Sequence, residues 1–361
     1  MRVLIIGGTG VLSRAIALEA IAGGHQVTIL TDGLGSLPEP SGLEGHLIAD
    51  RRDGNALVAA LSKTGVELWD LVVDAICYNE RQATSLLSAI KNKSRHTVII
   101  STAILYDRRN PLPLGTDSPL APPCELGEYG IGKATMEQMW LEAAKAIKHP
   151  VTILRLPHIL GVGCELGLVP LHNRDPLLLQ RLFNHQPLLL ADGGRQLLQV
   201  VFNDDVAKVI LTACGNPLTF GKIYNCASPE IVTGLKYFET ISQLLGVELT
   251  VENVPSEAIW NSDWGWSPTT ISRILELDTL RSDVGVIPST PLIKAIEVSL
   301  LHLQSRSHSH ESSDNCNFNG IRKAINHNID VIGKLLSNNS NKRVRTIVDE
   351  RMNTNAPSFR L

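Results

Sequence analysis

The chain has 361 residues, of which 43% are hydrophobic and 19% charged. That is enough for one large α/β domain or two ordinary ones, and it excludes a chain that is disordered as a whole. The net charge of −3 provides no broad basic surface, so nucleic acid is not expected as the main partner. The charge is unevenly spread, because residues 305–361 carry 9 basic and 5 acidic side chains and are rich in Asn and Ser. We expect this tail to bury little apolar surface, with a polar linker at 305–319 and at most one helix at 321–336.

The six cysteines are scattered and form no C-x-x-C pair. This pattern favours reduced thiols over a disulfide framework or a zinc site. The apolar run after Arg2 is too short for a signal peptide, and no run reaches about 18 apolar residues. We therefore expect a cytoplasmic protein that does not span a membrane.

The first part of the chain alternates short β-branched runs with helical stretches, as a parallel sheet built from βαβ units requires. The predicted strands are residues 2–6, 26–31, 46–49, 71–74, 97–101 and 151–155. The predicted helices between them are 11–22, 54–63, 81–91 and 129–147. Six strands with covering helices predict a doubly wound sheet.

After residue 155 the βαβ rhythm is lost, and Gly and Pro divide the chain into shorter pieces. Helices are predicted near 176–184, 204–214, 235–246 and 288–303, with apolar runs at 187–190 and 198–202. We interpret this part as a smaller C-terminal substrate-binding lobe. The predicted domains are thus 1–158, 159–303 and a tail at 304–361.

A glycine-rich turn, Gly7-Gly-Thr-Gly10, follows the first predicted strand and precedes the first helix. Gly7 permits a tight turn, and Gly10 lets the backbone approach a pyrophosphate at the positive end of the helix. Ser13 replaces the usual third glycine and is small enough to pack helix against strand. The pattern predicts a dinucleotide site whose phosphates lie on Gly7, Thr9, Gly10, Val11 and Leu12.

An acidic residue, Asp32, follows the second predicted strand. A carboxylate there accepts hydrogen bonds from the adenosine ribose and repels a 2′-phosphate, which favours NAD. Thr31 stands directly before it, and NADP would be tolerated if Thr31 took the decisive position and Asp32 turned to solvent.

Tyr129 and Lys133 are four residues apart on a predicted helix, which places both side chains on one face. A neighbouring ammonium stabilises a phenolate and lowers the phenol pKa, so the pair can act as a general acid or base. Ser101 and Thr102 end an apolar strand at the carboxyl edge of the sheet, where open α/β sheets place their ligands. A hydroxyl at that edge can bind the carbonyl or alcohol that is interconverted.

From residue 1 to about 303, the chain resembles the extended short-chain dehydrogenases/reductases, the group of NAD-dependent sugar epimerases and dehydratases with a Rossmann-type fold. The matching pieces are Gly7-Gly-Thr-Gly10, Ala49-Asp50-Arg51-Arg52-Asp53, Ser101-Thr-Ala-Ile-Leu-Tyr106, Tyr129-x-x-x-Lys133, Arg155-Leu-Pro-His-Ile-Leu-Gly161, Asn203-Asp-Asp-Val-Ala207 and Lys222-Ile-Tyr-Asn-Cys226. Within the group, Asp50-Arg-Arg-Asp53 and Val72-Val-Asp-Ala-Ile76 look most like a bacterial branch that also resembles chloroplast stem-loop-binding proteins.

This resemblance implies a role for each matching position. Thr102, with Ser101 as the alternative, would polarise the substrate, Tyr129 would be the acid/base, and Lys133 would hold the nicotinamide ribose. The implied cofactor contacts are Asp50 and Arg51 at the adenine, Ala75 and Ile76 after the fourth strand, and Pro157 at the nicotinamide. His158 falls where relatives often keep a polar substrate contact, although a core or surface histidine is equally expected.

Several positions depart from the family pattern. Leu198 occupies the place of the arginine that usually binds the diphosphate of a nucleotide sugar, and only Arg195 lies near it. Ala103 and Ile104 replace the Asp-Glu pair of the dehydratases, which disfavours dehydration. A cluster of Trp260, Trp264 and Trp266 either stacks on a substrate ring, with Trp264 as the candidate, or packs a loop against the lobe.

The sequence thus predicts an NAD(P)-dependent oxidoreductase or epimerase acting on a sugar or sugar nucleotide. A reductase of a small metabolite carbonyl is the second interpretation, and an RNA-associated protein on the same fold is the third. We expect a homodimer in which the helices at 81–91 and 129–147 form a four-helix bundle with the partner.

Overall fold

The computed structural model describes residues 1–35, 39–168, 175, 177–260 and 268–307. The chain divides into two units, each described by itself. Unit 1 comprises Met1–Ile159, Gln199–Ile231 and Arg273–Thr290. Unit 2 comprises Leu160–Leu198, Val232–Ser272 and Pro291–Leu361. The predicted helix at 321–336 lies outside the described residues.

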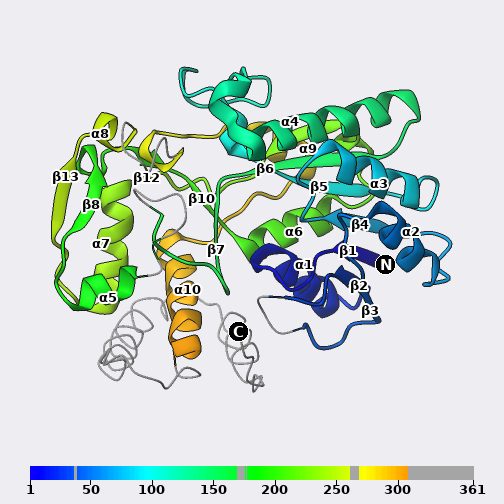
Figure 1. Cartoon of the computed structure of the whole chain (residues 1–361), viewed down its shortest axis with the longest axis horizontal. Helices are drawn as coiled ribbons and strands as arrows, with labels where there is room; N and C mark the ends of the chain where they lie inside the picture. The colour runs from blue at the N-terminus through cyan, green and yellow to red at the C-terminus, as the bar shows by residue number, and fades with distance from the viewer. Residues whose placement is uncertain (36–38, 169–174, 176, 261–267, 308–361) are drawn as a thin grey trace. The chain divides into compact units, whose positions relative to one another are not determined.

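Unit 1 is built on a seven-stranded sheet whose neighbouring strands all run parallel (Figure 1). The spatial order is β11-β6-β5-β4-β1-β2-β3. The strands are β1 (Arg2–Ile6), β2 (Gln26–Thr31), β3 (Gly45–Ile48), β4 (Leu71–Asp74), β5 (Thr97–Thr102), β6 (Val151–Leu156) and β11 (Lys222–Asn225). The order reverses between β1 and β4, and an open α/β sheet binds its ligands at the carboxyl ends of strands beside such a point.

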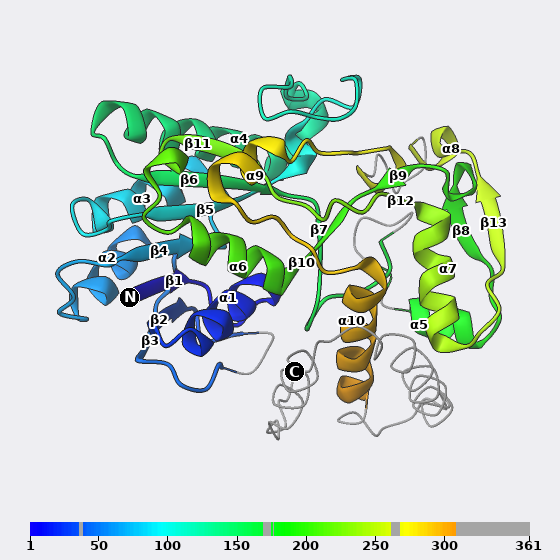
Figure 2. The ribbon, with the colours of Figure 1, turned by 180° about the vertical axis from the view of Figure 1, so that it is seen from behind.

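Helices cover both faces of this sheet, which confirms the predicted doubly wound fold. On one face lie α1 (Val11–Ala22), α6 (Asn203–Ala213) and α9 (Asp278–Val284), whose apolar side chains share a core with alternate strand residues (Figures 1 and 2). On the other face lie α2 (Gly54–Ser62), α3 (Glu80–Ile90) and α4 (Pro123–Ala146). The strands are buried on both sides, which explains their nearly continuous apolar sequences. Shorter elements of the chain are η1 (Ala103–Leu105), η3 (Pro217–Thr219), β7 (His158–Leu160) and β10 (Val200–Phe202), of which β7 pairs with β10.

The long helix α4 begins six residues earlier than the sequence predicts. Its helical assignment starts at Pro123, but Gly127 adopts φ 62° and divides a first turn from the main helix. Glycine reaches this conformation without steric cost, so a short capping turn precedes the segment that carries Tyr129 and Lys133.

The unit boundaries also differ from the sequence-based division at residue 158. Strand β11 lies far along the chain, yet its residues 222–225 pair with β6 in parallel register. Gln199–Ile231, which contains β11, therefore belongs to unit 1. Arg273–Thr290, which contains α9, belongs to unit 1 as well.

Unit 2 consists of short elements, as the irregular sequence predicts. Strand β8 (Leu188–Ala191) pairs in parallel with β13 (Val251–Val254), and β9 (Leu197–Leu198) pairs antiparallel with β12 (Val232–Thr233). The helical segments are α5 (Leu178–Phe183), η2 (Asp192–Gly194), α7 (Gly234–Leu245), α8 (Ser256–Trp260), η4 (Pro268–Thr270) and α10 (Leu292–Ser307). Among the described residues, no helix is both long and apolar enough to cross a membrane.

Candidate active site

The turn after β1 is shaped by two glycines with positive φ. Gly7 has φ 112°, and its N–H donates to the carbonyl of Leu30 at 2.8 Å. A Cβ on Gly7 would lie 3.0 Å from Ser13 Cβ, and one on Gly8 would lie 2.7 Å from Ile29 Cβ. Both positions therefore require glycine, and Ser13 packs against the turn as the sequence predicts.

Helix α1 starts directly after this turn, with Gly10 as its N-cap residue. The Gly10 N–H donates to Ser13 Oγ at 3.1 Å, and the first turn contains no acidic residue. The N–H groups of a first helical turn lack acceptors within the helix and carry its positive dipole end. Thr9, Val11 and Leu12 flank this end, so the turn has the shape and charge that a pyrophosphate requires.

The two candidate residues at the end of β2 have different surroundings. Thr31 is buried, its hydroxyl lies 2.7 Å from His46 Nε2, and it accepts the N–H of Gly33 at 3.1 Å. Asp32 is exposed and accepts the N–H of Leu34 at 2.9 Å. Asp32 is thus the residue with an accessible oxygen, which agrees with the NAD preference, and its contact with the ribose stays a prediction.

Asp50 lies at the surface in a two-pronged ion pair with Arg52. The Arg52 Nε is 3.0 Å from Asp50 Oδ1, and Nη2 is 2.9 Å from Oδ2. These hydrogen bonds lower the pKa of Asp50. Its predicted position beside the adenine remains a prediction.

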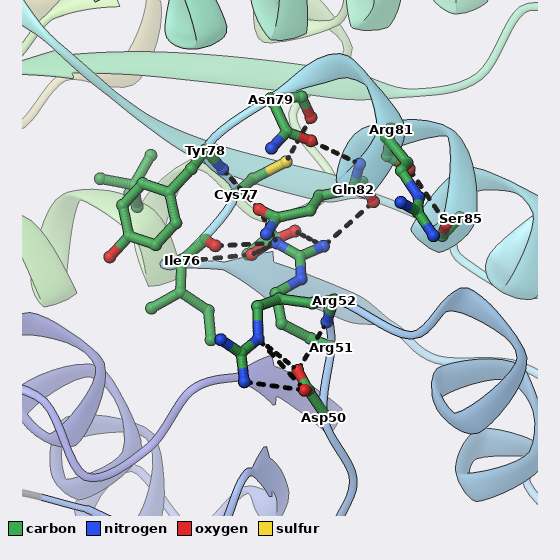
Figure 3. A network of polar contacts seen from close by, with 12 residues as sticks. Asp50, Arg51, Arg52, Ile76, Cys77, Tyr78, Asn79, Arg81, Gln82 and Ser85 are labelled. Carbon is green, nitrogen blue, oxygen red and sulfur yellow. Dashed lines mark hydrogen bonds and ion pairs between the residues drawn. The ribbon is translucent and has the colours of Figure 1, made fainter. Parts of the chain in front are cut away.

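The side chain of Arg51, by contrast, turns into the protein (Figure 3). Its guanidinium bridges to Asp74 at 3.0 Å and donates to the carbonyls of Ile76 at 2.9 Å and Gln82 at 3.1 Å. Asp74 is fully buried. Because a buried carboxylate is costly without a charged partner, the inward position of the Arg51 guanidinium stabilises it. The guanidinium of Arg51 thus fastens the loop between β4 and α3, and the implied contact of Arg51 with the adenine stays a prediction.

The loop after β4 places the other two expected cofactor-lining residues. Ala75 and Ile76 follow directly on Asp74 and are partly buried. The Ala75 N–H donates to Ile6 at the end of β1, and the Ile76 N–H donates to the Asp74 carboxylate at 3.1 Å. The loop is thus held at the carboxyl edge of β1 and β4.

The three predicted catalytic residues come together at the same edge of the sheet. Thr102 is the last residue of β5, and its hydroxyl is near enough to the phenol of Tyr129 in α4 to influence the ionisation of that phenol. The Lys133 ammonium lies 5.9 Å from the Tyr129 ring centroid and donates to the Ile100 carbonyl at 2.7 Å. Lys133 is 2% exposed, whereas Tyr129 is 45% exposed, so a buried cation lies beneath an accessible phenol.

Burial dominates the ionisation of this pair. Desolvation raises the pKa of Tyr129, and the neighbouring Thr102 hydroxyl opposes that rise. Desolvation lowers the pKa of Lys133 to about 8, against the opposing pull of its anionic neighbours. The expectation that Lys133 lowers the Tyr129 pKa is not what the structure shows, because partial desolvation of the phenol is the largest influence on its ionisation. Tyr129 is consequently protonated at neutral pH.

The remaining predicted site residues are placed as follows. Ser101 is buried, and its Oγ has no hydrogen-bond partner among the described residues. Pro157 and His158 are partly exposed after β6. Arg195 is an exposed residue of unit 2, where its Nε donates to the Asp192 carbonyl at 2.9 Å. Trp264 and Trp266 lie outside the described residues, as does the side chain of Trp260.

The structure adds Tyr78, which the sequence analysis did not single out. Its ring is 46% exposed, and its centroid lies 6.3 Å from that of Tyr129 and 5.1 Å from the Lys133 ammonium. The available signal was its place four residues after Asp74, in the loop that leaves the carboxyl edge of the sheet. The same reasoning from strand ends identified Thr102.

A doubly wound parallel sheet with a glycine turn, and a Tyr-Lys pair at its carboxyl edge, defines a dinucleotide-binding enzyme fold. The model of the NAD dependent epimerase/dehydratase family matches residues 3–227. The chain belongs to this family, which confirms the resemblance inferred from its motifs.

Relatives in this family have different named activities. The chain is 25% identical to 2′-dehydrokanamycin reductase of Streptomyces kanamyceticus, over 71% of this chain and 70% of that protein. It is 26% identical to the bifunctional pinoresinol-lariciresinol reductase of Forsythia intermedia, over 69% of this chain and 77% of that one. A chloroplast stem-loop binding protein of 41 kDa from Arabidopsis thaliana is 25% identical, but the match spans only 60% of that protein.

Solved structures share the fold at low sequence identity. UDP-glucose 4-epimerase of Thermotoga maritima matches with a TM-score of 0.70 at 16% identity, covering 85% of this chain and all of that one. UDP-glucuronic acid 4-epimerase of Bacillus cereus matches with a TM-score of 0.68 over the same share of this chain and all of that one, again at 16% identity.

NAD is the cofactor of this family, and the residues of this chain fit it. The glycine turn is packed so closely against Ser13 and Ile29 that a Cβ at Gly7 or Gly8 would collide with them, and the first turn of α1 carries no competing carboxylate. An accessible acid, Asp32, stands at the end of β2. These three observations match the pyrophosphate and ribose requirements of a dinucleotide.

Proposed function

We propose that the protein is an NAD(P)-dependent oxidoreductase or epimerase that acts on a hydroxyl or carbonyl group of a sugar or sugar nucleotide. The observation that carries the proposal is the grouping of Thr102 and the exposed Tyr129 phenol with the buried Lys133 ammonium, which lies 5.9 Å from the Tyr129 ring centroid. Two hydroxyls at one point can bind one substrate oxygen, and a protonated phenol can deliver a proton to it.

Each residue has a distinct task in this scheme. The glycine turn would hold the dinucleotide, whose nicotinamide would supply or accept the hydride at the substrate carbon. Tyr129 gives a proton to the substrate oxygen or takes one from it, while Thr102 orients that oxygen. The Lys133 ammonium uses one of its three N–H donors on Ile100, which leaves two for ribose hydroxyls.

We propose that the other residues predicted from the sequence bind the dinucleotide or the substrate. The pyrophosphate would rest on Gly7, Thr9, Gly10, Val11 and Leu12. Asp32 and Asp50 would border the adenosine, and Ala75, Ile76 and Pro157 would line the cofactor. His158, Arg195, Ser101 and Trp264 are the candidate substrate contacts.

Reduction of a small metabolite carbonyl is the second candidate. A phenol that is protonated at neutral pH is ready to donate a proton, as carbonyl reduction requires. The names of two relatives, from Streptomyces kanamyceticus and Forsythia intermedia, are those of reductases. The departures at Leu198 and Arg195 also weaken the case for a diphosphate-bearing substrate.

A substrate screen with Tyr129 variants tests both candidates. Nucleotide sugars and carbonyl metabolites would be screened by nicotinamide absorbance, and by product analysis for epimers, which cause no net absorbance change. We expect Tyr129→Phe to lower turnover by roughly 10²- to 10⁴-fold, because the proton donor is lost. NADH binding, followed by fluorescence, should be retained as the control. A Tyr129→Phe protein with full turnover on an identified substrate would refute the proposed role.

A further inference from the structure

The loop between β4 and α3 contains Tyr78, a residue to which the proposed function gives no role. Residues 75–79 leave the carboxyl end of β4, and Tyr78 projects from this loop toward the site. In Figure 3 the Tyr78 ring points away from the Arg51 network, while its backbone N–H faces that network. The backbone of Tyr78 thus contacts the Arg51 network, and its ring lies near Tyr129 and Lys133.

The loop is fixed from within by buried polar contacts. Gln82 Oε1 accepts the Tyr78 N–H at 2.8 Å, and the Arg51 guanidinium contacts both Gln82 and Ile76. Arg51 is in turn held by the fully buried Asp74. A buried, largely bonded network of this kind rigidifies the segment that it joins. Tyr78 is therefore attached to a rigid backbone, which is unusual for a loop residue.

The loop also lies directly against α4. A Cβ at position 132 would overlap the carbonyl oxygen of Tyr78, so the close approach depends on Gly132. Gly132 stands between Tyr129 and Lys133 in the sequence. The contact holds the backbone of Tyr78 against the helix that carries the lysine of the site.

The Lys133 ammonium therefore lies beside two neighbouring aromatic rings. It is 5.1 Å from the Tyr78 centroid and 5.9 Å from the Tyr129 centroid, both within the range of a cation–π interaction. The Tyr78 ring is the nearer one. Because the Lys133 side chain is only 2% exposed, this attraction stabilises its charged form more strongly than at an exposed surface.

We propose that Tyr78 is a positioning residue, whose ring holds the Lys133 ammonium in its charged form and in place beside Tyr129. The Arg51, Asp74 and Gln82 network sets the ring at that distance. This inference rests on the proposed function for the role of Lys133, although the interaction itself does not depend on turnover.

Several charged or titratable groups act on Lys133 from the elements around it. Asp74 of β4, Cys77 of the loop and Glu137 of α4 raise its pKa, and Arg51 lowers it. Burial raises the pKa of Cys77 to about 12, so this thiol is uncharged at neutral pH. The two phenols, Tyr78 and Tyr129, are also neutral there, because burial raises both of their pKa values. Their effect on the ammonium at neutral pH is therefore that of aromatic faces.

Lysine titration by NMR tests the proposal without any substrate. Full-length protein labelled with ¹³C at lysine Cε would be titrated as wild type, Tyr78→Phe and Tyr78→Leu, and Lys133→Met would assign the Lys133 signal. We expect Tyr78→Leu to lower the Lys133 midpoint by about one pH unit, the shift that a desolvated cation–π contact supplies. Tyr78→Phe keeps the ring and should keep the wild-type midpoint. The signal of Lys145, exposed on the same helix, is the internal reference.

The outcomes separate this inference from the proposed function. An unchanged midpoint in Tyr78→Leu, or an equal fall in Tyr78→Phe, would overturn the role of the ring. Circular dichroism of the two variants shows whether each is folded, and Tyr78→Phe remains informative if Tyr78→Leu is not. If the midpoint shifts as expected while Tyr129→Phe keeps full turnover, the contact stands and the proposed mechanism fails.

Discussion

Replacing Lys133 by Met removes a cation that folding buries almost completely. Lys133 is 2% exposed, and burial lowers its pKa from 10.5 to about 8. The difference corresponds to roughly 3 kcal/mol of folding free energy that the charged form costs. Met has a similar length and no charge, so it isolates this cost.

The sign of the pH dependence follows from which state binds the proton. Below about pH 8 both folded and unfolded chains hold it, and the full cost of the buried charge is present. Between about pH 8 and pH 10.5 the folded protein releases the proton while the unfolded chain keeps it, so the stability of the wild type rises with pH. Lys133→Met has no such ionisation. We expect the stability of the wild type, relative to this variant, to increase by about 3 kcal/mol between pH 7 and pH 10.5.

Urea unfolding at several pH values measures this difference. The buried Trp69 and Trp140 of unit 1 provide a fluorescence signal, and circular dichroism reports the helices. Lys145→Met, which removes an exposed lysine from the same helix, controls for the loss of one positive charge. A relative stability that stays flat from pH 7 to pH 10.5 would refute a desolvated Lys133 ammonium.

Two further predictions concern the Arg51 network and the oligomeric state. Arg51→Met leaves the fully buried Asp74 without its charged partner, and we expect it to lower the free energy of unfolding by about 3–5 kcal/mol. Arg52→Met removes only an exposed ion pair with Asp50, so urea unfolding should hardly change, and equal losses in both variants would contradict the assignment. A homodimer through α3 and α4 should give a light-scattering mass twice the 39.3 kDa of one chain, and a monomeric mass would exclude it.

Most elements of the Rossmann sheet could be predicted because their signals are local. Buried parallel strands are continuous apolar runs, and six of the seven were placed within one or two residues of their observed ends. The spacing of Tyr129 and Lys133 predicts that they share a helix face, and a strand end predicts that Thr102 meets them. These inferences require no knowledge of distant contacts.

The ionisation of the site could not be predicted in the same way. A tyrosine beside a lysine suggests a lowered phenol pKa, but partial desolvation of the Tyr129 phenol reverses the direction. Burial depends on how α4 packs against the sheet, which the four-residue spacing does not contain. The hydrogen bond from the Lys133 ammonium to the Ile100 carbonyl likewise depends on how α4 packs against β5.

By itself, the sequence determined the doubly wound fold, the glycine turn at Gly7 and Gly10, and the Thr102, Tyr129 and Lys133 set. Only the tertiary structure decided that strand β11 completes the sheet, because its partner β6 lies some seventy residues earlier in the chain. It also decided that Arg51 faces inward to Asp74 and that Tyr78 lies over Lys133. Such pairings are made across separate elements, so their energies depend on packing and desolvation and leave no periodic signal along the chain.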